Sequence, residues 1–237
     1  RGVKSASIAE ALGLNAFSLF RKSRIAIFFI FSMLLGAALQ LTNAYGDTFL
    51  HDFDKVDIYK DTIAVKYPAI IMSISQISET LFILAIPFFM KRFGIKRVML
   101  MSMFAWVLRF GLFGYGNPGD GLWMIILSCI VYGMAFDFFN ISGSLFIEGQ
   151  TSPKIRASAQ GLFMMMTNGF GAIIGSMASG YIIDLFFTNP DKTLQWKNIW
   201  LSFAGYSLVV AILFMILFKD EKPKYSEEDR TGVVALA

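Results

Sequence analysis

Residues 70–86 read IIMSISQISETLFILAI. The apolar residues at both ends are typical of a helix that crosses a lipid bilayer, yet Gln76 and Glu79 lie near the middle. A charged side chain at the centre of a bilayer costs on the order of 3 kcal/mol, so such residues are rare and usually functional. The stretch therefore predicts a membrane helix in which Glu79 is paired, protonated or in contact with water.

The composition of the whole chain supports a membrane protein. Hydrophobic residues make up 56% of the sequence, charged residues only 16%, and the mean hydropathy is +0.59. A soluble domain has about a quarter of its residues charged, and an apolar helix of roughly 20 residues spans the hydrocarbon core. Barrel strands would be shorter and would alternate in polarity. We therefore expect an all-α membrane protein with six spans, at residues 25–46, 68–90, 98–115, 121–147, 157–186 and 199–218.

Basic residues predict the orientation of these spans. They cluster at the ends that fall on one side: Arg21, Lys22, Arg24, Lys91, Arg92, Lys96, Arg97, Lys154, Arg156, Lys219, Lys222 and Lys224. Loops rich in Lys and Arg stay in the cytoplasm, and Trp and Tyr favour the membrane interface. We therefore expect both termini in the cytoplasm. The opposite side has the acid-rich segment 47–61, and we expect an aromatic belt there of Tyr67, Tyr115, Trp123, Trp196 and Trp200.

The two ends of the chain lie outside the predicted bundle of residues 24–218. Residues 5–20 predict an amphipathic helix with Ile8, Leu12, Ala16 and Leu19 on one face, either on the bilayer surface or packed beneath the bundle. Residues 219–237 are a charged tail. Because the sequence begins with Arg1 rather than Met, we expect the later part of a longer chain.

Polar residues recur inside the spans with one spacing. Gln76 and Glu79 are three residues apart and share a helix face. The other pairs are Gln40 and Asn43, Asp137 and Asn140, and the neighbours Thr167 and Asn168. The third and sixth spans are largely apolar, apart from Arg109 in the third. A 3+3 inverted repeat, in which the first two helices of each half line a cavity, produces this distribution.

These residues suggest the movement of a polar solute across the membrane. A carboxylate in a cavity of low polarity exchanges protons readily, and amides satisfy the hydrogen bonds of an uncharged solute such as a ribose or another sugar. Glu79 and Asp137 therefore predict proton coupling. Two alternatives stay open at this point. The amides could be hydrogen-bonding glue between helices, and Arg109 could be a counter-ion for a carboxylate or a substrate contact.

Other classes of function lack their motifs. The sequence has no HExxH, CxxC, P-loop or GxSxG pattern, and its single cysteine and single histidine are Cys129 and His51. We expect no metal, no cofactor and no enzymatic activity. The net charge of +4 comes with little clustering of basic residues, so nucleic acid is not an expected partner.

Four long stretches carry a resemblance to a known family. They are IFFIFSMLLGAALQLTNAYGDTFL (27–50), MSISQISETLFIL (72–84), VYGMAFDFFNISGS (131–144) and IRASAQGLFMMMTNGFG (155–171). They resemble the nucleoside:proton symporter family of the major facilitator superfamily. The resemblance implies the C-terminal six-helix half of a twelve-helix transporter, with residues 1–23 as the end of its central cytoplasmic loop and an N-terminal six-helix half as its partner.

The resemblance also implies a function. Purine and pyrimidine nucleosides would be imported across a bacterial inner membrane with protons, by alternating access. The implied binding positions are Gln40, Asn43, Gln76, Glu79, Phe136 and Asp137. Glu79 and Asp137 would accept hydrogen bonds from the ribose, Asp137 would be the first candidate for proton coupling, and Phe136 would stack on the base. Asn140 and Asn168 would be secondary polar lining. A facilitator or symporter for a sugar or another small polar solute is the alternative.

Two shorter motifs concern packing and turns. Gly171, Gly175 and Ser179 form a small-xxx-small face, which predicts close helix packing. The basic loop signature of the superfamily is only partly present in residues 87–97, where Arg92 and Gly94 remain.

Overall fold

The computed structural model describes residues 14–219. These residues are almost entirely helical, with one isolated β-bridge between Thr188 and Leu194. The α-helices are α2 (Ser23–His51), α3 (Ile63–Lys66), α4 (Pro68–Phe93), α5 (Ile95–Tyr115), α6 (Leu122–Gln150), α7 (Arg156–Met164), α8 (Ala172–Ile182) and α9 (Trp196–Leu217). Two short 3₁₀-helices, η1 (Leu14–Arg21) and η2 (Asp52–Lys55), and two π-helical segments, η3 (Met165–Gly171) and η4 (Ile183–Phe187), complete the described elements.

Six segments are long and apolar enough to cross a membrane, as expected. They are Ser23–Lys55, Pro68–Phe93, Ile95–Tyr115, Leu122–Gln150, Arg156–Phe187 and Trp196–Leu217. The first extends well past residue 46, where the sequence suggested an acid-rich loop. It continues because Phe49 and Leu50 are buried in the bundle, at 1% and 0% exposed.

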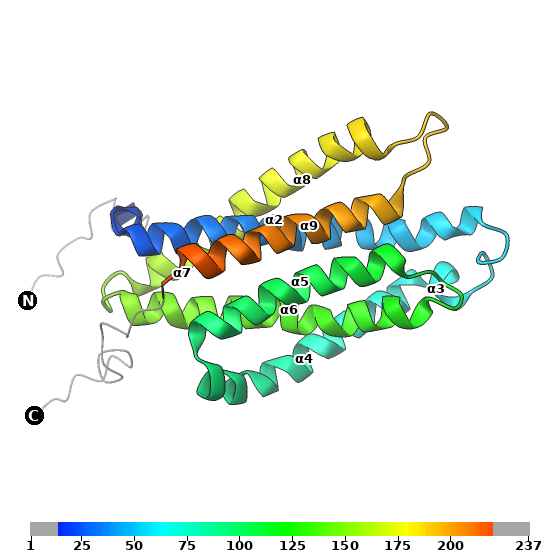
Figure 1. The fold of residues 1–237 in the computed structure, drawn as a ribbon. Coiled ribbons are helices and arrows are strands. Elements are labelled where there is room, and N and C mark those ends of the chain that lie inside the picture. The colour runs from blue at the N-terminus through cyan, green and yellow to red at the C-terminus, as the bar shows by residue number, and fades with distance from the viewer. Residues whose placement is uncertain (1–13, 220–237) are drawn as a thin grey trace, which may run out of the picture.

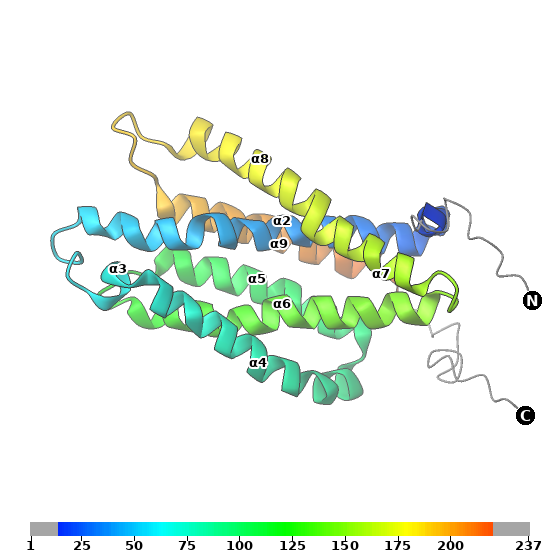
Figure 2. The same ribbon diagram turned by 180° about the vertical axis from the view of Figure 1, so that it is seen from behind.

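The spans form an elongated bundle with two layers. Seen from behind, α2, α4, α6 and the α7–α8 rod lie in front of α5 and α9 (Figure 2). The α4 and α8 helices diverge from the centre on opposite sides (Figures 1 and 2). Helix α6 packs most extensively on α5 and α4, and α2 packs on η3 and α8. The layer of α2, α4, α6 and α7–α8 holds the helices in which the sequence places the paired polar residues.

The packing pairs agree with the predicted inverted repeat. If α2, α4 and α5 form one half and α6, α7–α8 and α9 the other, the contact of α6 with α4 corresponds to that of α2 with η3 and α8. In the same way, the contact of α6 with α5 corresponds to that of α2 with α9, and α5 packs on α9. A two-fold relation between the halves produces such an exchange of partners.

The aromatic belt is only partly as predicted. Tyr67, Tyr115 and Trp123 are each 58% exposed, as interface residues are. Trp200 is fully buried instead, with its ring centroid 4.9 Å from that of Phe113, so its placement in the belt was wrong. It lies on the face of α9 that packs on α5, and the burial of this large ring holds the two helices together.

The segment before α2 packs on the bundle. In η1, Ala16 and Leu19 are each 1% exposed, and the helix contacts α2 and α7. For the described part of predicted helix 5–20, packing beneath the bundle is therefore the better of the two alternatives. Ile8, Leu12 and the tail from residue 220 onward lie outside the described residues.

Glycines set the closest helix contacts. An added Cβ at Gly175 would lie 2.7 Å from the Cα of Ala37, and one at Gly133 would lie 2.6 Å from the carbonyl carbon of Ser78. The predicted small-residue face thus brings α8 onto α2, and Gly133 brings α6 onto α4. Gly94 joins α4 to α5 with φ 77° and ψ 170°, a conformation open essentially only to glycine.

We expect Gly133→Val to lower the free energy of unfolding by about 1–3 kcal/mol, because a side chain there forces α4 and α6 apart. The control is Gly111→Ala, since a Cβ at Gly111 would meet no neighbouring helix or side chain within 4 Å in the described part of the chain. Thermal and denaturant unfolding of the detergent-purified protein measure the stability of both variants. Equal stability of the two variants would contradict the close contact.

Candidate functional site

The residues predicted for the site differ in their exposure. Asn43, Gln76 and Asn168 are exposed, and Gln40, Glu79, Phe136 and Asn140 are partly buried. Asp137 and Arg109 are buried, at 4% and 0% exposed. The side chains of Gln40, Asn43 and Gln76 make no hydrogen bond within residues 14–219. A hydrogen bond between helices requires a partner, so these three amides are instead available to a ligand or to a second domain.

The two carboxylates predicted for the site lie close together although they come from different helices. Glu79 in α4 and Asp137 in α6 are near enough to interact electrostatically, and the Tyr132 hydroxyl reaches the Glu79 carboxylate. The Oδ2 atom of Asp137 is buried and has no hydrogen-bond partner. A buried carboxylate with a vacant acceptor is costly as an anion and is better tolerated when it holds a proton.

Arg109 brings a buried positive charge close to Glu79. Its Nη1 donates to the Ser128 carbonyl at 2.6 Å, and its Nε donates to the Thr42 hydroxyl at 3.4 Å. The guanidinium lies 4.6 Å from the centre of the Tyr132 ring and 4.8 Å from that of Phe113. Within the described residues Arg109 forms no salt bridge within 4.0 Å, although it interacts electrostatically with Glu79. Its role as counter-ion stays a prediction.

A row of aromatic rings connects Arg109 to Phe136. The rings of Tyr132 and Phe136 stack with centroids 5.8 Å apart and an interplanar angle of 6°. Trp106 meets Tyr132 edge-on, also at 5.8 Å. Sequence reasoning missed Tyr132 and Trp106. The signal for Tyr132 was its position four residues before Phe136, on the same helix face, whereas Trp106 comes from an otherwise apolar span.

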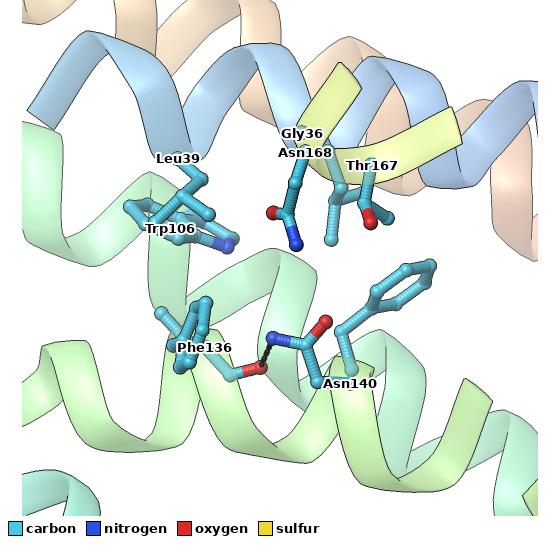
Figure 3. Close-up of a pocket in the computed structure, with 10 residues that line it drawn as sticks. Gly36, Leu39, Trp106, Phe136, Asn140, Thr167 and Asn168 are labelled. Carbon is cyan, nitrogen blue, oxygen red and sulfur yellow. Dashed lines mark hydrogen bonds between the residues drawn. The ribbon is translucent and has the colours of Figure 1, made fainter. Parts of the chain in front are cut away.

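A small recess lies between α2, η3 and α6, beside Phe136 (Figure 3). The side chains of Asn140 and Asn168 enter it from opposite sides (Figure 3). Its cavity volume is about 20 Å³, which is enough for one water molecule. Sites for small organic ligands are roughly 300–1,000 Å³, so this recess alone does not hold such a ligand.

The fold and these residues define a class of protein. Six membrane spans in an inverted repeat, with one buried and one partly buried carboxylate and free amides in one layer, are the features of half of a secondary membrane transporter.

Comparison with known proteins identifies the family. The sequence model described as Nucleoside H+ symporter matches residues 3–223, and the chain belongs to this family. It is 59% identical to the nucleoside permease NupG of Escherichia coli (strain K12) over 209 residues, which is 88% of this chain and 50% of that protein. It is 57% identical to the xanthosine permease of the same organism, over 90% of this chain and 51% of that protein.

The fold agrees with a solved structure. A crystal structure of a mutant form of the nucleoside transporter NupG matches with a TM-score of 0.86 and 58% identity, over 91% of this chain and 54% of that one. The chain therefore spans about half the length of the relatives that it matches. The major facilitator architecture expected from the sequence is confirmed for this half.

We expect Arg109→Lys to lower the free energy of unfolding by about 1.5–3 kcal/mol. Lysine keeps the charge but loses the planar fork that joins α5 to α2 and α6. Arg97→Lys is the matched control on the same helix, because Arg97 is exposed. Denaturant unfolding in detergent distinguishes them. A loss no larger than that of the control would show that the guanidinium contacts contribute little.

Proposed function

We propose that this chain forms one half of a proton-coupled nucleoside importer that works by alternating access. An N-terminal six-helix half supplies the opposite wall of the site. Two findings support this: the relatives are about twice as long, and the recess here holds only about 20 Å³. The observation that carries the proposal is the Glu79–Asp137 pair beside the Tyr132–Phe136 stack.

The chemistry of a nucleoside suits this arrangement. Its ribose hydroxyls donate to carboxylates, so Glu79 and Asp137 are the proposed acceptors for the sugar. Gln40, Asn43 and Gln76 offer both donors and acceptors and have no partners of their own within residues 14–219. Phe136 is partly buried, and Tyr132 stacks on one face of its ring. The other face is the proposed contact for a purine or pyrimidine base.

Asp137 is the proposed site of proton coupling. Its buried, unpartnered Oδ2 favours the protonated acid, and the neighbouring Glu79 adds to the cost of a second negative charge. Hydrogen bonds from the ribose would stabilise the anion and so link the proton to the substrate. A facilitator for a sugar or another polar solute is the second candidate, because a similar row of amides would serve it.

The proposed location is a bacterial inner membrane, with both termini of this chain in the cytoplasm. Helix α2 begins and α9 ends at the same end of the bundle (Figure 1). The basic residues Lys91, Arg92 and Lys96 lie at the turn between α4 and α5, which also falls on that end. The positive-inside rule supports this orientation.

Uptake of radiolabelled uridine into proteoliposomes tests the proposal. The full-length transporter that contains this chain is assayed with and without an imposed inward proton gradient. Stimulation by the gradient is the expected result. Equal uptake with and without the gradient would favour the facilitator, and failure to take up any nucleoside would overturn the proposed substrate class.

We expect Asp137→Asn to abolish accumulation driven by the proton gradient, because an amide neither binds nor releases a proton at neutral pH. Asp137→Glu keeps the carboxyl group and should retain part of the accumulation. Exchange of uridine for uridine across the membrane, which needs no net proton movement, is the internal control for folding. Unchanged accumulation by Asp137→Asn would remove this residue from the coupling mechanism.

We expect Gln76→Ala and Glu79→Gln each to raise the KM for uridine by roughly 3- to 30-fold, the loss of one or two hydrogen bonds. Kinetics of uptake measure KM, and size-exclusion chromatography reports folding. Aggregation of both variants would indicate that these residues serve packing rather than binding.

A further inference from the structure

We infer that Asn140 and Asn168 form a subsite that reads the polar edge of the nucleobase. This inference rests on the proposed function, because it assigns part of the nucleoside to the recess. The two carboxamides come from different helices and enter the recess from opposite sides, next to Phe136 (Figure 3). A base that stacks on Phe136 therefore turns one edge toward them.

The local backbone directs Asn168 into the recess. Asn168 lies in η3, where the helix is π-helical between α7 and α8. A π-helical turn changes the direction of the side chains that follow it, and such turns often occur at functional sites. The segment packs directly on α2, since the Thr167 backbone lies against Gly36 and an added Cβ at Gly171 would lie 2.9 Å from the Cα of Gly36.

Both carboxamides have unused hydrogen-bonding capacity. The Asn140 Nδ2 donates to the Phe136 carbonyl at 3.1 Å, which leaves its Oδ1 as an acceptor for the recess. Within residues 14–219, the hydrogen bond of the Asn168 side chain is a weak one from its Nδ2 to the Met164 sulfur, at 4.0 Å. By contrast, the neighbouring Thr167 hydroxyl donates to the carbonyls of Phe163 and Met164, at 3.1 and 3.2 Å. The Asn140 Oδ1 and the Asn168 carboxamide, together with the indole N–H of Trp106, are thus the polar groups of the recess that make no strong hydrogen bond of their own within residues 14–219 and are left for a ligand.

The size of the recess limits what enters it. A volume of about 20 Å³ admits one group of the size of a water molecule. A carbonyl oxygen or an amino group on a base is of this size, while the ring itself is too large. We therefore place the ring over Phe136 at the mouth of the recess, with one exocyclic group inside it.

The chemistry of a carboxamide matches that of a base edge. A carboxamide presents a donor beside an acceptor, and purines and pyrimidines present the complementary pair on their Watson–Crick edge. Enzymes that bind an unstacked base combine hydrogen bonds to this edge with stacking on an aromatic side chain. The Asn140 carboxamide is held in one orientation by the Phe136 carbonyl, whereas that of Asn168 can rotate to exchange donor and acceptor, which suits a carrier for several bases.

The test compares two ribosides, one with polar groups on its ring and one without them. Uridine has polar groups on its base, whereas a phenyl C-riboside keeps a flat ring and the ribose without them. KM for uptake of each is measured in proteoliposomes that hold the full-length transporter. The variants are Asn168→Leu and Asn140→Leu, which approach the recess from opposite sides. The control is Ser176→Ala, an exposed position two turns along the same rod.

We expect each leucine variant to raise the KM for uridine roughly 3- to 10-fold, the loss of one hydrogen bond. The KM for the phenyl riboside should change less than about two-fold, because that ring makes no such bond. Asn168→Gln, which keeps the carboxamide, should recover part of the uridine affinity, and Ser176→Ala should match the unaltered protein. If one leucine variant does not fold, the other tests the subsite from the opposite wall.

Equal changes for both ribosides, or no change for either, would overturn the subsite. So would an unaltered protein that takes up the phenyl riboside as readily as uridine. These outcomes leave the proposed nucleoside transport intact. Failure of the unaltered protein to take up any nucleoside would instead overturn the proposed function, and the subsite with it.

Discussion

The constraint on which this structure depends is the cost of an unsatisfied polar group in hydrocarbon. Most buried hydroxyls of the bundle obey it by donating to a backbone carbonyl. Ser32 donates to the Phe28 carbonyl at 2.8 Å, and the Ser102 hydroxyl of α5 donates to the Ala135 carbonyl of α6. Against this background, an acid or amide without a partner stands out. The Asp137 Oδ2 and the free amides of Gln40 and Gln76 are such groups, and they belong to one layer of the bundle.

Close packing by small residues makes this layer possible. Lipid tails are as apolar as leucine, so association of membrane helices relies on van der Waals contact and hydrogen bonds. Gly133 allows α4 to approach α6, which brings Glu79 near Asp137. Gly36 and Gly171 allow η3 to approach α2, which places Asn168 opposite Asn140. The same contacts that hold the bundle together therefore set the positions of the polar groups.

The sequence predicted the spans and the polar pairs because both depend on local patterns. Apolar length determines a span, and a spacing of three residues places Gln76 and Glu79 on one face whatever their neighbours are. Features that depend on distant contacts were missed. A tryptophan at the end of a span is typical of the membrane interface, and nothing local in the sequence distinguishes Trp200 from an interface residue. It is buried by its partners on α2 and α5, which are distant in the sequence.

Two features of the site escaped prediction for a similar reason. Trp106 joins the aromatic row only because α5 packs on α6. The π-helical turn at Asn168 has no signature in MMMTNGFG, which is compatible with an ordinary α-helix. Its tight fit against Gly36 involves a residue more than 130 positions away in the sequence.

A site divided between two halves has a consequence for how such a transporter works. A ligand shifts a conformational equilibrium only if it binds the two states with different affinity. In the proposed transporter, the binding side chains of this chain are held on one packed layer, so the distances between them need not change. The difference in affinity then comes from how well the opposite half closes over the same nucleoside. A substrate bound only by this half would leave the equilibrium unchanged. The nucleoside must therefore stay within reach of the opposite half while the groups of this chain hold it.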